Sequence, residues 1–186
     1  CRFEGEEDGE SAVKECENIR ADGCYMDLRY PFWHVRGLEI NGCEMTVNCR
    51  AALWYDENVR IADSVLNGIK AFRECKNVIM ENVTAVSPEF GWKCENFSVG
   101  HCKIVSQYAF FESGGIEAED LDFEGKYSFQ YVRNAAFRNS TFRTKDAFWH
   151  SKNATVADSV IEGEYLGWYS EGLTLIRCRI KGTQPL

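Results

Sequence analysis

Long apolar runs and an excess of basic residues are both missing from this 186-residue chain. No stretch approaches the ~18 consecutive apolar residues of a membrane-spanning helix, so we expect a soluble chain without membrane contact. Lys and Arg number 21 against 29 Asp and Glu, which gives a net charge of -8 and a pI near 5.0. Because nucleic-acid binding depends on clustered Lys and Arg, nucleic acid is not expected as a partner.

Linkers and familiar catalytic motifs are missing too. No Pro-, Gly- or Ser-rich stretch divides the chain, so residues 1–186 are predicted to form a single domain. The sequence has no Gly-rich phosphate loop, no His-Glu-x-x-His and no nucleophile elbow. It also has no Cys-x-x-Cys or other metal-ligand spacing. We therefore predict neither a cofactor nor a metal site.

What the chain does contain is a repeat, best seen in the stretch Asn153-Ala-Thr-Val-Ala-Asp-Ser-Val-Ile-Glu-Gly163. Its outline recurs at 19-residue intervals, with one interval of 21 between Gly37 and Asn58. A fixed period of this length is typical of a solenoid. The residues equivalent to Asn153, called anchors below, are Asn18, Gly37, Asn58, Asn77, Asn96, Gly115, Asn134, Asn153 and Gly172.

Apolar residues stand one, three, six and eight positions after each anchor, which is the periodicity of strands with one buried face. The fifth position after the anchor holds residues that tolerate a bend, such as Gly23, Asp63 and Asn139. Two short strands therefore flank a bend, and a third side completes each rung. The predicted fold is all-β: a single-stranded parallel β-helix of about nine rungs, with three parallel sheets running its length.

Asn and Gly exchange at the anchor because both readily adopt the left-handed conformation of a sharp corner. Stacked rung on rung, the Asn side chains can also hydrogen-bond along the column. We interpret them as structural corners.

Cysteine exchanges with Ser, Val and Leu in two columns, six after and two before the anchor. Small buried hydrophobes behave in this way. Neighbours within one column, such as Cys24 and Cys43, should lie ~4.8 Å apart, a distance that does not exclude disulfides. The odd count of nine and the buried columns favour reduced thiols and a cytoplasmic location. The thiols expected to be buried are those of Cys24, Cys43, Cys75, Cys94, Cys102 and Cys178.

All five tryptophans share the column four before the anchor, beside a Phe-rich column that is expected to be core. Because the tryptophan column also holds Arg73 and Gln130, and unpaired buried charge is costly, we interpret it as facing outward. Strict alternation from the Cys/Ser/Val column gives the opposite orientation, with Trp inside as core filler. An outward column would form an aromatic groove suited to sugar rings or a protein surface. The candidate binding residues are Trp33, Trp54, Arg73, Trp92, Lys93, Phe111, Trp149 and Trp168.

The column three before the anchor supplies the catalytic candidates Glu74, Glu112 and His150. Glu74 and Glu112 should lie about 10 Å apart, slightly beyond the ~6.5–9.5 Å of an inverting glycosidase pair. His34 and His150 lie six rungs apart, roughly 29 Å, so they cannot share a proton relay. These candidates therefore give little support to catalysis.

Several stretches resemble a known family. Gly9-Glu-Ser11, Lys145-Asp-Ala-Phe-Trp149 and Gly163-Glu-Tyr-Leu-Gly-Trp168, with Ala71-Phe-Arg73 and Trp92, resemble the bacterial family called domain of unknown function 3737. The 19-residue rung with an Asn corner also resembles the right-handed β-helix of the pectin-lyase-like superfamily. These resemblances imply a fold and no established activity. The paired-Asp and His-Gly motifs of polygalacturonases are missing.

Both ends of the chain are predicted to be truncated. Cys1-Arg-Phe3 matches the second strand of a rung without its first, and the last rung stops at Leu186 where the next corner is due. Open rung ends would allow oligomers to form.

The sequence favours a non-enzymatic binding or scaffolding β-helix whose tryptophan face takes a glycan or a protein. The alternative is a carbohydrate-active lyase or hydrolase that acts along the same groove.

Overall fold

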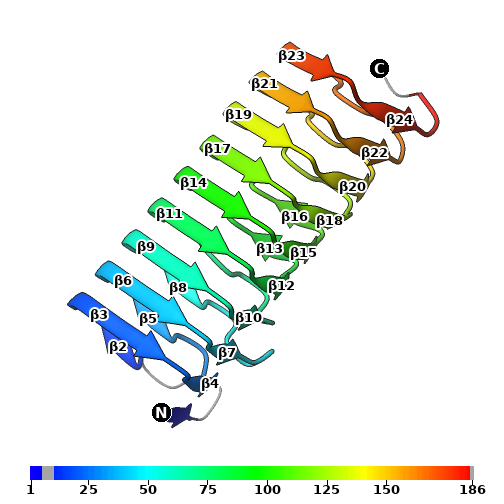
Figure 1. The fold of residues 1–186 in the computed structure, drawn as a ribbon. Coiled ribbons are helices and arrows are strands. Elements are labelled where there is room, and N and C mark those ends of the chain that lie inside the picture. Colours follow the sequence, from blue (N-terminus) through cyan, green and yellow to red (C-terminus); the bar gives the residue numbers. More distant parts are fainter. Residues whose placement is uncertain (6–10, 185–186) are drawn as a thin grey trace.

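The computed structural model describes residues 1–5 and 11–184, which form one long stack of rungs (Figure 1). In this part of the chain every regular element is a strand, and no helix is long and apolar enough to cross a membrane. Each strand pairs in parallel with its equivalent in the next rung, as the 19-residue period predicts. Of the stretch Gly9-Glu-Ser11, only Ser11 lies within the described residues, and Leu186 lies outside them.

Two parallel sheets run the whole length of the stack. A nine-stranded sheet is built from the six-residue strands around the anchors: β3 (Glu17–Asp22), β6 (Arg36–Asn41), β9 (Glu57–Ala62), β11 (Lys76–Glu81), β14 (Glu95–Gly100), β17 (Gly114–Glu119), β19 (Arg133–Arg138), β21 (Lys152–Ala157) and β23 (Glu171–Ile176). A ten-stranded sheet follows the bend: β1 (Arg2–Glu4), β4 (Tyr25–Asp27), β7 (Glu44–Met45), β10 (Val65–Leu66), β12 (Thr84–Val86), β15 (Lys103–Ser106), β18 (Asp122–Gly125), β20 (Thr141–Thr144), β22 (Val160–Glu162) and β24 (Arg179–Lys181).

The third sheet is shorter than predicted. It consists of β2 (Val13–Lys14), β5 (Phe32–Trp33) and β8 (Leu53–Trp54), then β13 (Glu89–Phe90) and β16 (Tyr108–Ala109). Between β8 and β13, Arg73 continues this side with two isolated parallel bridges, one to Trp54 and one to Trp92. From Phe72 onward, the residue five before the anchor often has a positive φ, as at Phe110 and Phe148. A left-handed residue at this position bends the backbone, so the third side of these rungs does not continue as an extended strand.

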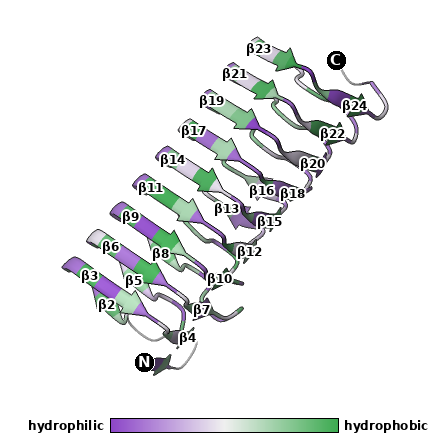
Figure 2. Ribbon diagram, viewed as in Figure 1, coloured by the Kyte–Doolittle hydropathy of each residue, from purple (hydrophilic) through white to green (hydrophobic). Residues whose placement is uncertain are grey.

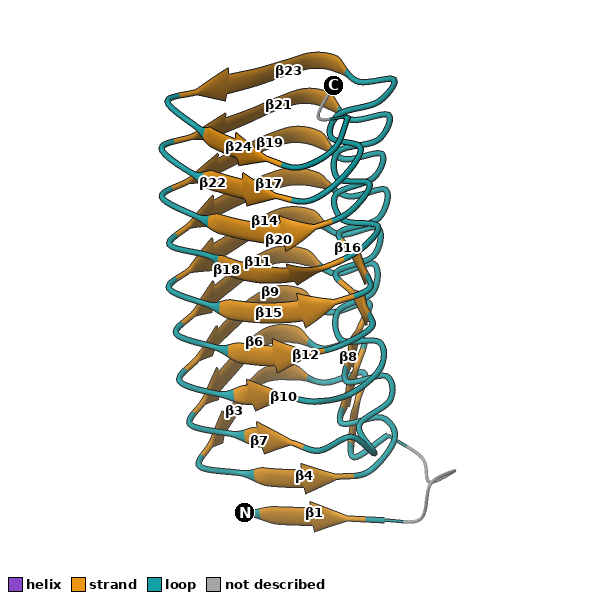
Figure 3. Ribbon diagram, turned by 90° about the vertical axis from the view of Figure 1, so that its right-hand side faces the viewer, coloured by secondary structure: helices purple, strands orange, loops and turns teal. Residues whose placement is uncertain are grey.

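The coil is right-handed. With the C-terminal rungs at the top, the ten-stranded sheet runs from left to right in front and the nine-stranded sheet runs from right to left behind it (Figure 3). Because the chain climbs from the N-terminus at the bottom, this sense of rotation is that of a right-handed coil. It is the hand that parallel crossovers generally adopt.

Each rung has three left-handed corners. All nine anchors have φ between 52° and 73°, and all nine residues five positions later have φ between 48° and 58°, which confirms both predicted corners. The third corner, three before the anchor, was not predicted from the sequence. It holds residues such as Glu15, His34 and Tyr55, all with φ between 52° and 62° in the nine rungs.

The Asn anchors hydrogen-bond along their column, as predicted. Asn77 Nδ2 donates to Asn58 Oδ1 at 3.0 Å, and Asn96 Nδ2 donates to Asn77 Oδ1 at 3.1 Å. Asn153 Nδ2 likewise donates to Asn134 Oδ1 at 2.8 Å. We call these two runs the amide ladder. It stabilises corners that the backbone alone would adopt at some cost.

The one 21-residue interval leaves the strand register unchanged. Leu38 in β6 still pairs with Val59 in β9. The extra residues lie in a turn at 46–50, where Asn48 Nδ2 donates to Asp27 Oδ1 at 2.9 Å. This turn packs on Gly68, since a Cβ there would lie 1.7 Å from the Cys49 carbonyl oxygen.

The core is a column of apolar side chains enclosed by the three sides. Hydrophilic and hydrophobic residues both occur along the long strands (Figure 2), and apolar residues such as Leu38 and Ile40 are buried in the core. Phenylalanines stack through its centre, as in the contact of Phe72 with Phe97 at 5.0 Å between ring centroids. The Phe-rich column five before the anchor is buried at Phe32, Phe72, Phe110, Phe129 and Phe148, as predicted.

The cysteines largely follow the predicted burial. Cys24, Cys43, Cys75, Cys94 and Cys102 are buried, whereas Cys178, which was expected to be buried, is half-buried. All nine are free thiols. Burial raises the pKa of Cys102 to about 11 and that of Cys43 above its ordinary value, so both thiols are protonated at neutral pH.

Candidate functional site

The tryptophan column lies outside the core. All five indoles are half-buried, while the Phe column beside them is buried. This agrees with the outward interpretation and contradicts the inward one. The column consists of Lys14, Trp33, Trp54, Arg73, Trp92, Phe111, Gln130, Trp149 and Trp168.

The indole nitrogens are bound within the fold. Trp54 Nε1 donates to the Lys70 carbonyl at 3.0 Å, and Trp92 Nε1 donates to the Tyr108 carbonyl at 2.7 Å. Trp149 makes the equivalent bond at 3.3 Å. Each bond joins two residues that are 16 positions apart in the sequence. The indole N–H groups of these three residues are therefore not free for a ligand.

Neighbouring rungs also cover the ring faces. Trp149 and Trp168 stack with centroids 5.7 Å apart and planes 2° from parallel. The Arg73 guanidinium lies over the rings of Trp54 and Trp92, at 5.2 and 5.5 Å from their centroids. Each of these rings therefore has at least one face in contact with a neighbouring rung, and the binding of sugar rings along this column stays a prediction.

The residues three before the anchor form a second ladder, which we call the corner column: Glu15, His34, Tyr55, Glu74, Lys93, Glu112, Tyr131, His150 and Tyr169. His150 is stacked between Tyr131 and Tyr169, at 4.9 and 5.0 Å between centroids. His34 stacks on Tyr55 at 4.8 Å. The left-handed backbone at each corner turns these side chains outward, beside the tryptophan column.

Two open troughs lie between the corner column and the residues directly before the anchors, which we call the charge column. One trough, of about 350 Å³, is lined by Glu15, Cys16, Glu17, His34, Arg36, Tyr55 and Glu57. The other, of about 430 Å³, is lined by Lys93, Glu95, Glu112, Tyr131, Arg133, His150 and Lys152. Both have an aromatic wall and a charged wall.

The charged walls are built from ion pairs between rungs. Lys76 Nζ lies 3.2 Å from Glu57 Oε1, and Lys152 Nζ lies 3.5 Å from Glu171 Oε2. Arg133 pairs with Glu95. Because all these groups are exposed, the pairs add little stability. They do present both signs of charge to a partner along the troughs.

Two of the three catalytic candidates, Glu112 and His150, line the same trough, and Glu74 does not line it. Glu112 Oε2 lies 3.6 Å from Lys93 Nζ, and His150 is held between two tyrosine rings. Glu74 lies two rungs before Glu112 in the same column. Within residues 1–5 and 11–184, no group of three His, Cys, Asp or Glu side chains could hold a metal ion.

Asp56 is a buried carboxyl that the sequence reasoning missed. Its Oδ1 accepts the Val35 N–H at 2.7 Å, and its Oδ2 has no hydrogen-bond partner among the described residues. Burial raises the pKa of Asp56 to about 7. Its position two before the anchor, shared with Cys75 and Cys94, was a signal that could have revealed it.

His101 was expected to be a bend residue, and it also joins three rungs. Its Nδ1 lies 2.7 Å from Glu81 Oε1 and its Nε2 lies 3.1 Å from Asp120 Oδ2. The hydrogen bond with Glu81 raises the pKa of His101 above its ordinary value.

Fold and surface together define the protein class: a right-handed parallel β-solenoid with an aromatic edge. The family model described as "Protein of unknown function (DUF3737)" matches residues 1–186, and the chain belongs to this family. The wider resemblance to the pectin-lyase-like superfamily stays a prediction. Comparison with curated protein sequences gives no match.

Several solved structures resemble this chain in part. The surface protein and adhesin PfbA of Streptococcus pneumoniae is 7% identical to this chain, with a TM-score of 0.42. The superposition covers 91% of this chain and 63% of the PfbA chain. QnrB1, a plasmid-mediated fluoroquinolone resistance protein, is 12% identical, with a TM-score of 0.29. The superposition covers 89% of this chain and 92% of the QnrB1 chain. HetL, a pentapeptide repeat protein of Nostoc sp. strain PCC 7120, is 11% identical, with a TM-score of 0.27. The superposition covers 91% of this chain and 90% of the HetL chain.

Proposed function

We propose that the chain is a non-enzymatic binding or scaffolding protein that holds an extended partner in the two troughs beside the corner column. The observation that carries this proposal is the run of stacked side chains along one edge, next to walls that offer both signs of charge. Because the rungs stack at a fixed spacing, contacts repeat along the edge and weak individual contacts add up.

We further propose that the partner is a protein segment. Trp149 and Trp168 stack on each other and Arg73 lies over Trp54 and Trp92, which leaves fewer ring faces for a glycan to stack on. The edges of aromatic rings carry partial positive charge and attract carbonyl oxygens. The paired charges beside them can bind both the N–H and the C=O groups of an extended backbone. A glycan remains an alternative outcome of the test, and no observation favours a carbohydrate-active enzyme.

The test is a selection from a random peptide library, followed by affinity measurements on one enriched peptide. Tyr131→Ala should weaken binding by about tenfold, since it removes one wall of the larger trough. Val86→Ala is the matched control, because Val86 is 46% exposed on the ten-stranded sheet. Equal weakening by both variants, or binding of an oligosaccharide with its cleavage, would overturn the proposal.

We also propose that the protein resides in a reducing compartment such as the cytoplasm. The support is chemical: Cys24 and Cys43 are neighbours in one buried column, with the Cys24 N–H donating to Cys43 Sγ at 3.3 Å. Both are free thiols in the structure. Mass mapping of protein from its native source tests this, and a disulfide between these two residues would contradict it.

A further inference from the structure

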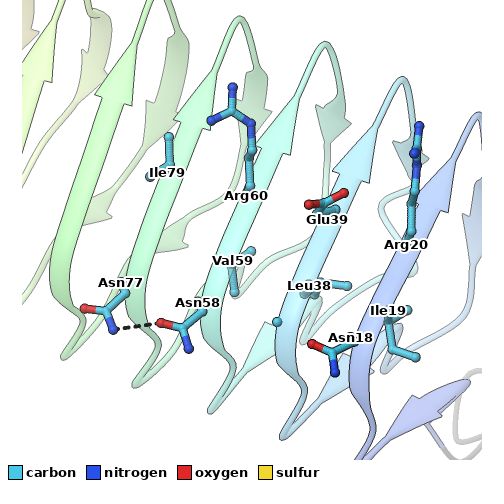
Figure 4. Close-up of a pocket in the computed structure, with 11 residues that line it drawn as sticks. Asn18, Ile19, Arg20, Leu38, Glu39, Asn58, Val59, Arg60, Asn77 and Ile79 are labelled. Carbon is cyan, nitrogen blue, oxygen red and sulfur yellow. Dashed lines mark hydrogen bonds between the residues drawn. The ribbon is translucent and has the colours of Figure 1, made fainter.

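A third trough lies on the outer face of the nine-stranded sheet, across the charge column from the aromatic edge. Its volume is about 490 Å³. It is bordered by two rows of side chains, the anchors and the residues two positions after them (Figure 4). The polar and exposed members of these rows are Asn18, Asn58, Asn77, Arg20, Glu39, Arg60 and Ile79.

The amide ladder is interrupted inside this trough. Asn58 Oδ1 accepts from Asn77, so the Asn58 Nδ2 group is on the opposite side, towards Gly37 in the preceding rung. A Cβ at Gly37 would lie 2.9 Å from Asn18 Oδ1, so the Asn18 oxygen faces the same space from the other side. In Figure 4, the strand of Leu38 and Glu39 lies between Asn18 and Asn58. An acceptor and a donor therefore face each other across one rung that has no side-chain amide.

The gap has the length of one amide group. Rungs repeat at about 4.8 Å, and each ladder bond is about 3 Å long. The distance from Asn18 Oδ1 to Asn58 Nδ2 should therefore be about 8 Å, which an inserted carboxamide fills with one hydrogen bond at each end. The backbone does not require glycine here, because six other rungs hold Asn in the same left-handed conformation.

Two charged side chains beside the gap are available to a partner. Arg60 and Glu39 occupy paired positions in β9 and β6. Neither makes an ion pair or a side-chain hydrogen bond with any other described residue. This contrasts with the charge column, where neighbouring rungs form ion pairs. An unpaired guanidinium favours a carboxylate, with which it can form two parallel hydrogen bonds.

We propose that the gap at Gly37 binds the side-chain carboxamide of an Asn or Gln in a protein partner, and that Arg60 binds a carboxylate next to that amide. The carboxamide accepts from Asn58 Nδ2 and donates to Asn18 Oδ1, which continues the amide ladder from rung to rung. This site goes beyond the proposed aromatic edge and does not rest on it.

The test uses N-acetyl-L-asparagine, which carries both a carboxamide and a carboxylate. In NMR titrations of the whole chain, the side-chain resonances of Asn58 and Arg60 should shift in a saturable way. N-acetyl-L-leucine, which lacks the side-chain carboxamide, should bind at least about tenfold more weakly, the effect of losing roughly 1.4 kcal/mol of hydrogen bonding. Absence of saturable shifts at Asn58 with the asparagine probe would overturn the proposal.

Gly37→Asn supplies the missing amide from the protein itself and should abolish probe binding without lowering the melting temperature. Gly115→Asn is the matched control. Gly115 also interrupts the ladder, with Asn96 Oδ1 2.7 Å from a Cβ built there, but it lies outside this trough. It should leave binding unchanged. Unaltered binding in Gly37→Asn would overturn the proposal.

A second variant tests the proposal independently, in case Gly37→Asn does not fold. Asn58→Gly keeps the left-handed corner and removes the donor, so it should weaken the probe about tenfold. Tyr131→Ala should leave probe binding intact, which separates this site from the aromatic edge. Equal probe affinity in Asn58→Gly and the unmodified chain would contradict the proposal.

Discussion

Asp56 occupies a column in which other rungs place thiols and hydroxyls that donate to the backbone. Ser113 Oγ donates to the Gly91 carbonyl at 2.7 Å, and Cys75 Sγ donates to the Leu53 carbonyl at 3.3 Å. A protonated carboxyl can donate in the same way, but an ionised one cannot. The column therefore favours the neutral acid at Asp56.

This preference makes stability depend on pH. The pKa of Asp56 is raised from 3.8 to about 7 on folding, so its stabilising effect is complete below about pH 4 and is lost as pH rises through 7. The loss is on the order of 4 kcal/mol, from 1.36 kcal/mol per pKa unit. Burial raises the pKa of the neighbouring Cys75 thiol well above 9.0, so it stays neutral over this range.

Asp56→Ser should therefore raise the free energy of unfolding at pH 8 and flatten its slope between pH 5 and pH 8. Ser fits the column, because Ser113 and Ser151 occupy equivalent buried positions. Denaturant titrations across this pH range measure the effect. Asp63→Ser, on an exposed corner, is the control and should leave the slope in place. A slope that persists in Asp56→Ser would show that other groups produce it.

Trp92 presents an intermediate case between core and surface. Trp92→Ala removes a half-buried ring, its hydrogen bond to the Tyr108 carbonyl and its contact with Arg73, so we expect a loss of about 1–3 kcal/mol. Phe90→Ala, in the fully buried stack, should cost about 3–5 kcal/mol. Equal midpoints for the two variants in urea would contradict this order.

At the scale of the element, the corner is the unit that sets each rung. Asn77 lies in the middle of the amide ladder, accepting from Asn96 and donating to Asn58. Asn77→Gly keeps the left-handed backbone and removes both bonds, whereas Asn77→Ala removes both bonds and leaves a residue that disfavours the left-handed conformation at φ 54°.

We therefore expect Asn77→Gly to lose about 1–2 kcal/mol of stability and Asn77→Ala to lose about 1 kcal/mol more. Chemical denaturation of both variants measures the two contributions separately. If Asn77→Gly were as stable as the unmodified chain, the ladder bonds would contribute nothing beyond the corner conformation.

These corners also show how far sequence reasoning reaches. The anchors and the bends were predictable because Asn, Gly and Asp have a chemical preference for left-handed backbone. The third corner holds His34, Glu74 and Tyr131, which have no such preference, so the stack imposes it and no single rung reveals it. The same limit applies to the site: orientation of the tryptophans followed from Arg73, but the covering of their faces depends on contacts between rungs.

At the scale of the whole molecule, one continuous core excludes solvent from most thiols. Native protein should react slowly with a thiol reagent at Cys75, Cys94 and Cys102, which are at most 3% exposed. The exposed Cys1 should react quickly and serves as the internal control. Peptide mapping after labelling measures this, with full modification expected in denaturant. Rapid labelling of Cys94 in native protein would indicate that rungs open locally.

The turn at 46–50 shows that one edge of the stack can take up extra chain without disturbing either long sheet. Val47 at its tip is 68% exposed. A foreign peptide inserted after Val47 would therefore be displayed away from the aromatic edge while the coil kept its pitch, which makes this corner a natural point for attaching a reporter or an affinity tag.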